Sequence, residues 1–388
     1  MANLKDYISW RGDLSFSASP FNEVDNLVLA ELTYGDFDNV LDESGRRMTI
    51  PELRDAYFAM HPREEVSARK SFTGSVGLLL DPMAESVRFS GIEVCWYHNH
   101  ISVDADVQMA ALTYLLPDGK VYVSFRGSDG TIVGWKEDFN FSYMIGTAGQ
   151  KEAVEYLNHL NDTKNPIIVG GHSKGGNFAV YASAFCAPWL QARITDVYNN
   201  DGPGFPKSVL SAPEYMSVRD RIHSIIPENS MIGILMHSDV SHKVIASSEK
   251  GIAQHDAMSW QVLGNHFVEV DGRNLDSFIF DETMQLWLKD LSDEERKSFI
   301  ETVFGIFEDT GLETMDEIND AWYKTFPEII HSLGNLEKDK RDEVINILMQ
   351  LGEKYGKVVK TQLKKKVTAR RQKIAERKEA GEDEKDNS

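Results

Sequence analysis

Residues 165–177 limit the folds open to this chain more than any other segment, because they read as a buried strand that turns sharply into a helix around one serine. Residues 167–169, Ile-Ile-Val, are apolar and β-branched, as in a central parallel strand covered on both faces. Gly171, Ser173 and Gly175 then form a G-x-S-x-G pattern, whose glycines allow strand and helix to approach closely. The segment therefore predicts a strained turn that exposes the Ser173 hydroxyl.

Strand and helix patterns alternate on both sides of this turn. Residues 107–116 and 121–125 are apolar and flank Pro-Asp-Gly-Lys, which predicts a hairpin. An amphipathic pattern predicts a helix over 149–160. Further strand candidates are residues 194–204, which end in a glycine and proline loop, and residues 221–227 and 241–247. The alternation predicts an α/β protein with a largely parallel sheet and helices on both faces.

The 388 residues are enough for one large domain with additions at both ends. We expect a mostly helical segment over 1–70 packed on the core, an α/β core over 71–280, a helical appendage over 281–352, and a basic helix with a disordered acidic tail over 353–388. Capping residues predict helix starts in the first and third of these segments: Asn22 or Asp25, Thr49, and Ser292 with Glu295.

Charge is distributed unevenly along the chain. The formal net charge of −20 argues against general nucleic-acid binding, which requires cationic groups to neutralise phosphates. Residues 354–378 nevertheless carry 11 Lys and Arg against one acid. We expect this stretch to be either a solvated charged helix or a contact for an anionic membrane surface or a partner. Two cysteines, no apolar run of membrane-spanning length and no leader pattern predict a cytoplasmic protein.

A serine hydroxyl becomes an effective nucleophile when a histidine takes its proton and an acid orients that histidine. After a serine in this kind of turn, the acid and then the histidine follow along the chain. We favour His255, because residues 251–260 form a loop of small and polar residues after the last strand candidate. His237 and His242 are alternatives. Three other histidines follow Ser173: His223 lies in a strand pattern, His331 lies in the appendage, and the third is His266.

For the acid we favour Asp201, which follows a predicted strand in a Gly-Pro-Gly loop at the carboxyl edge of the sheet, where active sites collect. Asp239 is the alternative acid, and a turn-forming role is the simplest alternative for Asp201. An oxyanion needs preorganised donors. We expect the backbone N–H of Lys174, directly after the nucleophile, and Ser128 from an earlier loop.

Three segments together carry a family resemblance: Phe125-Arg-Gly-Ser128, Gly134-Trp-Lys-Glu-Asp138 and Gly171-His-Ser-Lys-Gly-Gly176. This combination resembles the class-3 triacylglycerol lipases, over roughly residues 107–260. The resemblance implies an α/β-hydrolase fold, a nucleophilic serine in the third segment, oxyanion donors at Ser128 and Lys174, and a surface segment after Asp129 that acts as a lid.

The chain departs from those lipases at two places. Lys174 stands where they usually carry leucine, and residues 226–233 lack an aspartate where they carry their acid. The second departure favours Asp201, whose Asn-Asp-Gly-Pro context looks like the acid loop of pancreatic-type lipases. The whole chain is similar to an uncharacterised bacterial branch of lipase-like hydrolases.

The expected function is therefore a serine hydrolase that cleaves small-molecule or lipid-derived carboxylic esters through an acyl-Ser173 intermediate. A thioesterase, peptidase or acyltransferase could use the same residues. The alternative from another class is a non-catalytic α/β-hydrolase-fold scaffold that binds partners through its appendage and basic tail. We expect no cofactor and no specific nucleic-acid partner. We also expect no metal, because His172 is predicted to pack against the sheet and no other spacing suggests metal ligands.

Overall fold

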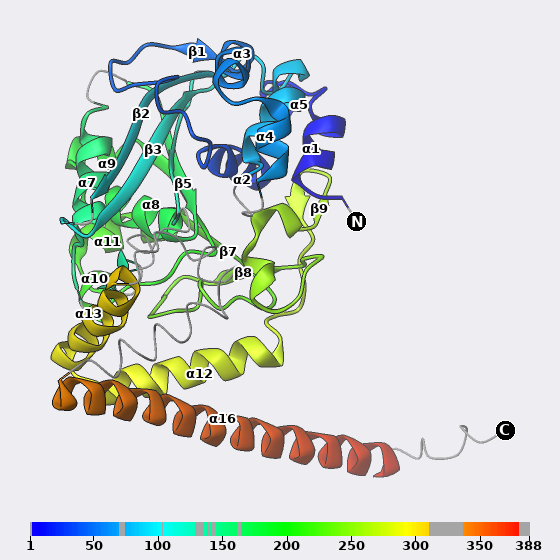
Figure 1. Cartoon of the computed structure of the whole chain (residues 1–388). Helices are drawn as coiled ribbons and strands as arrows, with labels where there is room; N and C mark the ends of the chain where they lie inside the picture. Colours follow the sequence, from blue (N-terminus) through cyan, green and yellow to red (C-terminus); the bar gives the residue numbers. More distant parts are fainter. Residues whose placement is uncertain are drawn as a thin grey trace.

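An eight-stranded sheet runs through the middle of the molecule, with its strands lying in sequence order (Figure 1). The computed structural model describes residues 2–69, 74–102, 104–128, 136–137, 140–141, 144–160, 164–309 and 337–379. Neighbouring strands are antiparallel from β1 to β4 and parallel from β4 to β8, so the predicted hairpin is confirmed as β3 and β4. The strands are β1 (Met48–Thr49), β2 (Glu93–Ser102), β3 (Val107–Leu115), β4 (Val121–Phe125), β5 (Ile167–His172), β6 (Ile194–Asn200), β7 (Ile222–Pro227) and β8 (His242–Ile245).

This strand order determines where the connecting helices lie. A right-handed crossover between sequential parallel neighbours always places its helix on the same face of the sheet. Accordingly α7 (Ala148–Asn158), α8 (Lys174–Phe185) and α11 (Pro213–Val218) pack side by side. Val121 and Val123 of β4 point into the apolar cluster that these helices form. The other face of the sheet therefore has to be covered by a different part of the chain.

The N-terminal segment covers that second face. Helix α2 (Glu23–Leu32) lies against β4, β5 and β6, and its residues from Val24 onward are all buried. Tyr122, which points opposite to its neighbours on β4, shares a core cluster with α2. Other helices of the segment complete this layer: α1 (Leu4–Arg11), α3 (Ile50–Met60), α4 (Arg63–Ala68) and α5 (Leu80–Glu85), the last preceded by the 3-10 turn η1 (Val76–Leu79). Helices thus cover both faces, as predicted, in the arrangement of the α/β-hydrolase fold.

A buried ion pair holds the N-terminal layer together. Arg88 donates from Nε and Nη2 to the two carboxylate oxygens of Asp25, at 2.6 and 2.5 Å, and both side chains are buried. Asp25 also accepts from the Tyr7 hydroxyl at 2.9 Å and from the backbone N–H of Asn22, whose side chain caps α2 in return. Arg88 further donates to three backbone carbonyls of the loop before α2. The network therefore joins α1, α2 and the chain between them.

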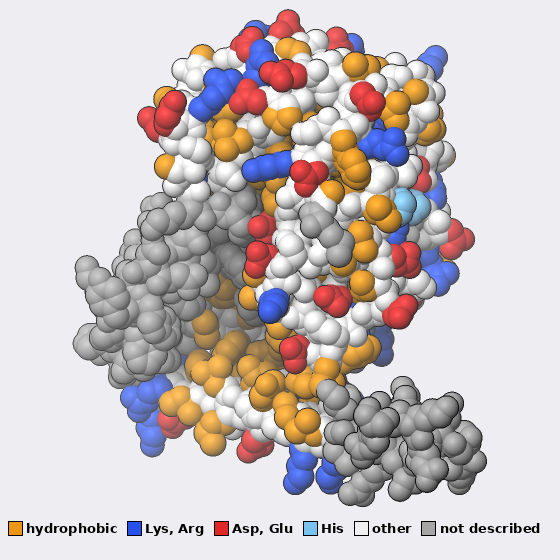
Figure 2. Space-filling view, turned by 90° about the vertical axis from the view of Figure 1, so that its right-hand side faces the viewer, with side chains coloured by type: hydrophobic (Ala, Val, Ile, Leu, Met, Phe, Trp, Pro, Cys, Tyr) orange, Lys and Arg blue, Asp and Glu red, His pale blue; other side chains and the backbone are white. Residues whose placement is uncertain are grey.

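In the described residues of the C-terminal part, from Leu275 onward, the elements are three helices: α12 (Leu275–Asp290), α13 (Asp293–Asp309) and α16 (Lys338–Glu379). The predicted capping box at Ser292 is confirmed at the start of α13. Helix α16 lies along α12 at the bottom of Figure 1, and Figure 2 shows hydrophobic side chains gathered in this lower region. Residues 354–378 lie within α16, and their binding role stays a prediction. No helix among the described residues combines the length and apolarity needed to cross a bilayer.

Strand β2 is the main element that the sequence pattern does not predict. His98, Asn99 and His100 interrupt its apolar alternation, and a bulge between Cys95 and His98 shifts its register against β3. The remaining short elements are α9 (Pro188–Gln191), α10 (Lys207–Leu210), the 3-10 turns η2 (Arg219–Arg221), η3 (Gly251–His255) and η4 (Ala257–Ser259), and a separate pair, β9 (Val262–Leu263) and β10 (His266–Phe267).

The Arg88→Met variant tests the buried pair. Removing the guanidinium leaves the buried Asp25 carboxylate without its main partner. We therefore expect the free energy of unfolding, measured in urea, to fall by about 3–5 kcal/mol. Arg63→Met is the matched control, because Arg63 binds Asp81 with the same two-bond geometry while their side chains are 50% and 36% exposed. The free energy of unfolding of Arg63→Met should fall by less than about 1 kcal/mol. Equal losses in the two variants would contradict the assignment.

Candidate active site

Ser173 occupies the turn between β5 and α8 with a backbone that non-glycine residues rarely adopt, φ 57° and ψ −133°. The flanking glycines are required by close contacts. A Cβ on Gly171 would lie 2.3 Å from the Gly175 backbone, and one on Gly175 would lie 2.0 Å from the carbonyl oxygen of Phe125. The turn is held from the other side because the Ser173 N–H donates to the Asn200 carbonyl at 2.9 Å.

The Ser173 hydroxyl, His255 and Asp201 form one hydrogen-bonded chain. His255 Nε2 lies 2.9 Å from Ser173 Oγ, and His255 Nδ1 lies 2.6 Å from Asp201 Oδ2. Asp201 follows β6 directly, and His255 is the last residue of η3. Asp201 is fully buried, whereas the His255 side chain keeps 16% exposure. The fold therefore brings together the three residues that the sequence nominated from separate loops.

Asp201 is fixed on both carboxylate oxygens. While Oδ2 faces His255, Oδ1 accepts from the Ser230 hydroxyl at 2.5 Å and from the Gly233 N–H at 3.1 Å. The alternative acid, Asp239, is elsewhere: it accepts from the Tyr215 hydroxyl and the Arg219 guanidinium. Residues 226–233, noted for lacking an aspartate, thus supply donors to Asp201 instead. Their role could not be read from the sequence, because Ser230 and Gly233 reach Asp201 only when the two loops pack together.

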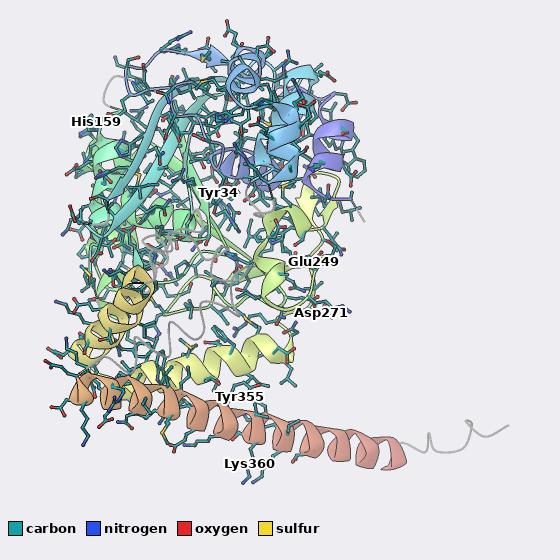
Figure 3. The ribbon with its side chains drawn as sticks, viewed as in Figure 1. Tyr34, His159, Glu249, Asp271, Tyr355 and Lys360 are labelled. Carbon is teal, nitrogen blue, oxygen red and sulfur yellow. The ribbon has the colours of Figure 1, made fainter. Side chains whose placement is uncertain are left out.

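His172, the residue before the nucleophile, packs inside the protein against His255. Their ring centroids are 4.7 Å apart. Burial, and then the charge of His255, lowers the pKa of His172 well below its ordinary value, so its ring is neutral. Its Nε2 then donates to the His255 carbonyl at 2.9 Å, and Nδ1 accepts from the hydroxyl of Tyr34, labelled in Figure 3, at 3.1 Å. His172 is therefore placed to hold the backbone of His255.

A buried acid adjoins His172 on its other side. Glu31 Oε1 lies 3.4 Å from His172 Nδ1, and both side chains are fully buried. Burial raises the pKa of Glu31 well above its usual range, and the charge of Asp256 adds to this effect. Burial likewise raises the pKa of Asp256. Burial therefore disfavours the charged forms of both Glu31 and His172, which lie next to each other behind His255.

The loop after β4 lies directly against the Ser173 turn. A Cβ on Gly127 would lie 2.9 Å from Ser173 Cβ and 2.6 Å from the His172 carbonyl oxygen. Ser128, the next residue, is 8% exposed. Lys174, the residue directly after Ser173, is the first residue of α8. Ser128 and Lys174 thus flank the nucleophile, and their oxyanion role stays a prediction. Residues 129–135, including the predicted lid, lie outside the described residues.

Lys174 is accommodated by an ion pair that the sequence analysis missed. Its Nζ donates to Glu137 Oε2 at 3.2 Å, and both side chains are fully buried. Glu137 also accepts from the N–H groups of Gln108 and Gly149 and from the Thr147 hydroxyl. This explains how a lysine fits where similar lipases carry leucine. The available signal was Glu137 itself, which lies in a segment that carries the resemblance but received no role.

The loop that presents His255 is fixed by side chains outside the hydrogen-bonded chain. The buried Trp260 donates from Nε1 to the Gln254 carbonyl at 2.9 Å. The Gln254 side chain accepts from the Asn229 N–H at 2.8 Å. Sequence reasoning gave these residues no role, because each is recognisable only from its contact with another loop.

A family model described as Mbeg1-like matches residues 83–305, which is more than half of the chain. The matched range contains Ser128, Ser173, Asp201 and His255. No curated protein matches the chain.

The contacts of Gly175 predict the effect of adding one methyl group. In Gly175→Ala, the new Cβ meets the Phe125 carbonyl, so α8 has to move and stability should fall by about 1–3 kcal/mol or more. Gly352→Ala on α16 is the control, because no atom lies within 4 Å of its new Cβ. There alanine should stabilise by up to about 1 kcal/mol through its higher helix propensity. Thermal unfolding of both variants measures the difference. A Gly175→Ala variant as stable as the wild type would contradict the close contact.

Proposed function

The chain belongs to the Mbeg1-like family, and from that premise we propose that the protein is a serine hydrolase that cleaves carboxylic esters through an acyl-Ser173 intermediate. The family suggests a lipase-like hydrolase. The finer proposal is supported by one observation above all, the continuous hydrogen bonds from Ser173 Oγ through His255 to Asp201. A base within hydrogen-bond reach of a hydroxyl, itself oriented by a buried acid, is the arrangement that activates a serine.

The proposed reaction begins when His255 Nε2 removes the proton from Ser173 Oγ as that oxygen attacks the ester carbonyl carbon. Asp201 accepts the Nδ1–H of the resulting imidazolium and stabilises its charge. Backbone donors at Lys174 and Ser128 stabilise the oxyanion that forms. The alcohol leaves with the proton from His255, and a water molecule, deprotonated by the same histidine, then hydrolyses the acyl-serine. The acid product and free Ser173 result.

An apolar pocket lies beside the loop that carries Asp201. It supports the proposal that the acyl part of the ester is apolar. Pro203, two residues after Asp201, lines this pocket together with Leu235 and with Met284 and Trp287 of α12. Apolar pockets with a few polar groups at one end are typical of small-molecule sites. We therefore favour lipid-derived or other apolar acyl esters over strongly polar ones.

The activity is tested by hydrolysis of p-nitrophenyl butyrate and by labelling with a fluorophosphonate. Ser173→Ala should abolish labelling, and Ser173→Ala and His255→Ala should each lower kcat by a factor of about a million. Asp201→Asn should lower kcat by about ten-thousand-fold, because the histidine loses its orienting acceptor. Asp239→Asn is the matched control, and its rate should stay within a few-fold of the wild type.

Two outcomes would overturn the proposal. A folded wild type that neither reacts with fluorophosphonate nor exceeds Ser173→Ala in hydrolysis would favour the non-catalytic scaffold. A loss in Asp239→Asn as large as that in Asp201→Asn would contradict the assigned acid. A thioester with the same acyl group, run in parallel, identifies a thioesterase by its faster cleavage.

Met284→Lys tests the pocket as an acyl site. A charge placed in the apolar lining should lower kcat/KM for p-nitrophenyl octanoate at least about tenfold relative to the acetate, because each added methylene then loses apolar contact. Gln285→Lys adds the same charge at the next, exposed position of α12 and should leave the ratio unchanged. Parallel losses for acetate and octanoate in Met284→Lys would place the acyl chain elsewhere.

A further inference from the structure

Two histidines and a glutamate converge on the sheet face that α7 covers. His98 and His100 pair with Ala111 and Met109 of β3, whose side chains belong to the apolar cluster on that face. Because alternate residues of a strand point to the same side, both imidazoles face α7. There the carboxylate of Glu152 meets them: its Oε1 lies 2.8 Å from His100 Nδ1 and 3.6 Å from His98 Nε2.

The spacing of these three groups suits one small cation. One ligand atom from each residue can be chosen so that all lie within 4.8 Å of one another. Ligand atoms bound tetrahedrally to zinc at its usual bond lengths are about 3.4 Å apart. The distances between the ligand atoms of the three residues are in part shorter and in part longer than this value. Modest side-chain rotations would therefore bring all three groups to bonding distance of one ion.

Two atoms of the cluster point to a missing partner. Among the described residues, His98 Nε2 and Glu152 Oε2 are buried and make no hydrogen bond. An imidazole–carboxylate ion pair by itself would leave both atoms unsatisfied, which is costly for buried polar groups. A cation between the side chains would use the His98 Nε2 lone pair and a carboxylate oxygen of Glu152 directly.

Glu43 completes the arrangement from the N-terminal segment. It accepts a hydrogen bond from His98 Nδ1, on the side of the ring that faces away from Glu152. That bond places the proton on Nδ1 and leaves the Nε2 lone pair directed at the cluster. Metal-binding histidines usually donate their second N–H to a carboxylate in this way, which orients the ring and makes it a better ligand.

The framework around the cluster is fixed independently of any ion. Tyr156, one turn after Glu152 on α7, donates from its hydroxyl to the Trp96 carbonyl of β2 at 2.5 Å. Its hydroxyl also lies 2.8 Å from that of Thr113 on β3. These hydrogen bonds fix the position of α7 along β2, and this position brings Glu152 close to the two histidines.

We propose that His98, His100 and Glu152 bind a Zn²⁺ ion that links β2 to α7, with Glu43 hydrogen-bonded to His98 in support. Two imidazoles and one carboxylate are a zinc donor set, whereas Mg²⁺ and Ca²⁺ prefer oxygen ligands throughout. The sequence pattern missed the site because Glu152 follows His100 by 52 residues.

The ion would act on structure and not on the ester chemistry. His98 pairs with Ala111, Ala111 with Phe125, and Phe125 with Gly171. Three spacings between neighbouring strands amount to about 14 Å, which is too far for a metal at His98 to reach an ester held at Ser173. The expected effect is to fasten the antiparallel side of the sheet to the helix layer.

Zinc chloride titration of chelator-treated, untagged full-length protein tests the proposal by calorimetry. We expect one Zn²⁺ per chain and a Tm that rises on zinc addition. Binding should be lost in His98→Ala/His100→Ala and weakened at least about tenfold in Glu152→Gln, while Glu43→Gln should weaken it about 10–100-fold through the orientation of His98. A large excess of Mg²⁺ should not compete.

His159→Ala is the matched control, because His159 is another exposed histidine, at the end of α7 (Figure 3). Its zinc affinity and Tm shift should equal those of the wild type. Circular dichroism of each zinc-free variant checks folding, and the near-isosteric Glu152→Gln keeps the test valid if the double variant does not fold. Each of three results would overturn the proposal. These are a wild type that does not bind Zn²⁺ stoichiometrically, zinc binding as in the wild type by both Glu152→Gln and the double variant, and a loss of zinc affinity in His159→Ala as large as in the cluster variants.

Discussion

The backbone of Ser173 is the constraint on which the rest of the site depends. A serine with φ 57° and ψ −133° costs of the order of 1–3 kcal/mol and persists only where its surroundings fix it on both sides. Here Asn200 of β6 binds its N–H, and Gly175 lets α8 lie against Phe125 with no Cβ between them. Because the hydroxyl position follows from this turn, a shift of α8 would remove Ser173 from His255.

Sheet topology places a second constraint on the molecule. Sequential parallel strands put their crossover helices on one face, so the N-terminal segment has to cover the other. This explains why α2 is buried yet polar at several positions: Asn26 donates to the Asn200 side chain, which in turn donates to the Gly171 carbonyl. Tyr34 reaches His172 from the same segment. The N-terminal layer is thus part of the support for the Ser173 turn.

The C-terminal helices are joined to the acid in a similar way. Ser277 of α12 donates to the Ser230 carbonyl at 2.7 Å, and the Ser230 hydroxyl donates to Asp201. The same helix lines the apolar pocket beside Pro203. One element therefore stabilises the acid loop and shapes the neighbouring pocket, which gives the helical appendage a physical role in the proposed ester hydrolase beyond covering the core.

The sequence by itself determined the features whose causes lie within a few residues. Residues 165–177 encode the strand, turn and helix, Asn22 and Ser292 encode helix starts, and chain order with loop context nominated His255. Only the tertiary structure decided that Asp201 and not Asp239 meets this histidine, that Lys174 is paired with Glu137, and that β2 joins the sheet. The physical reason is range: turns and caps depend on neighbouring dihedrals and hydrogen bonds, whereas these partners come together only when distant segments pack.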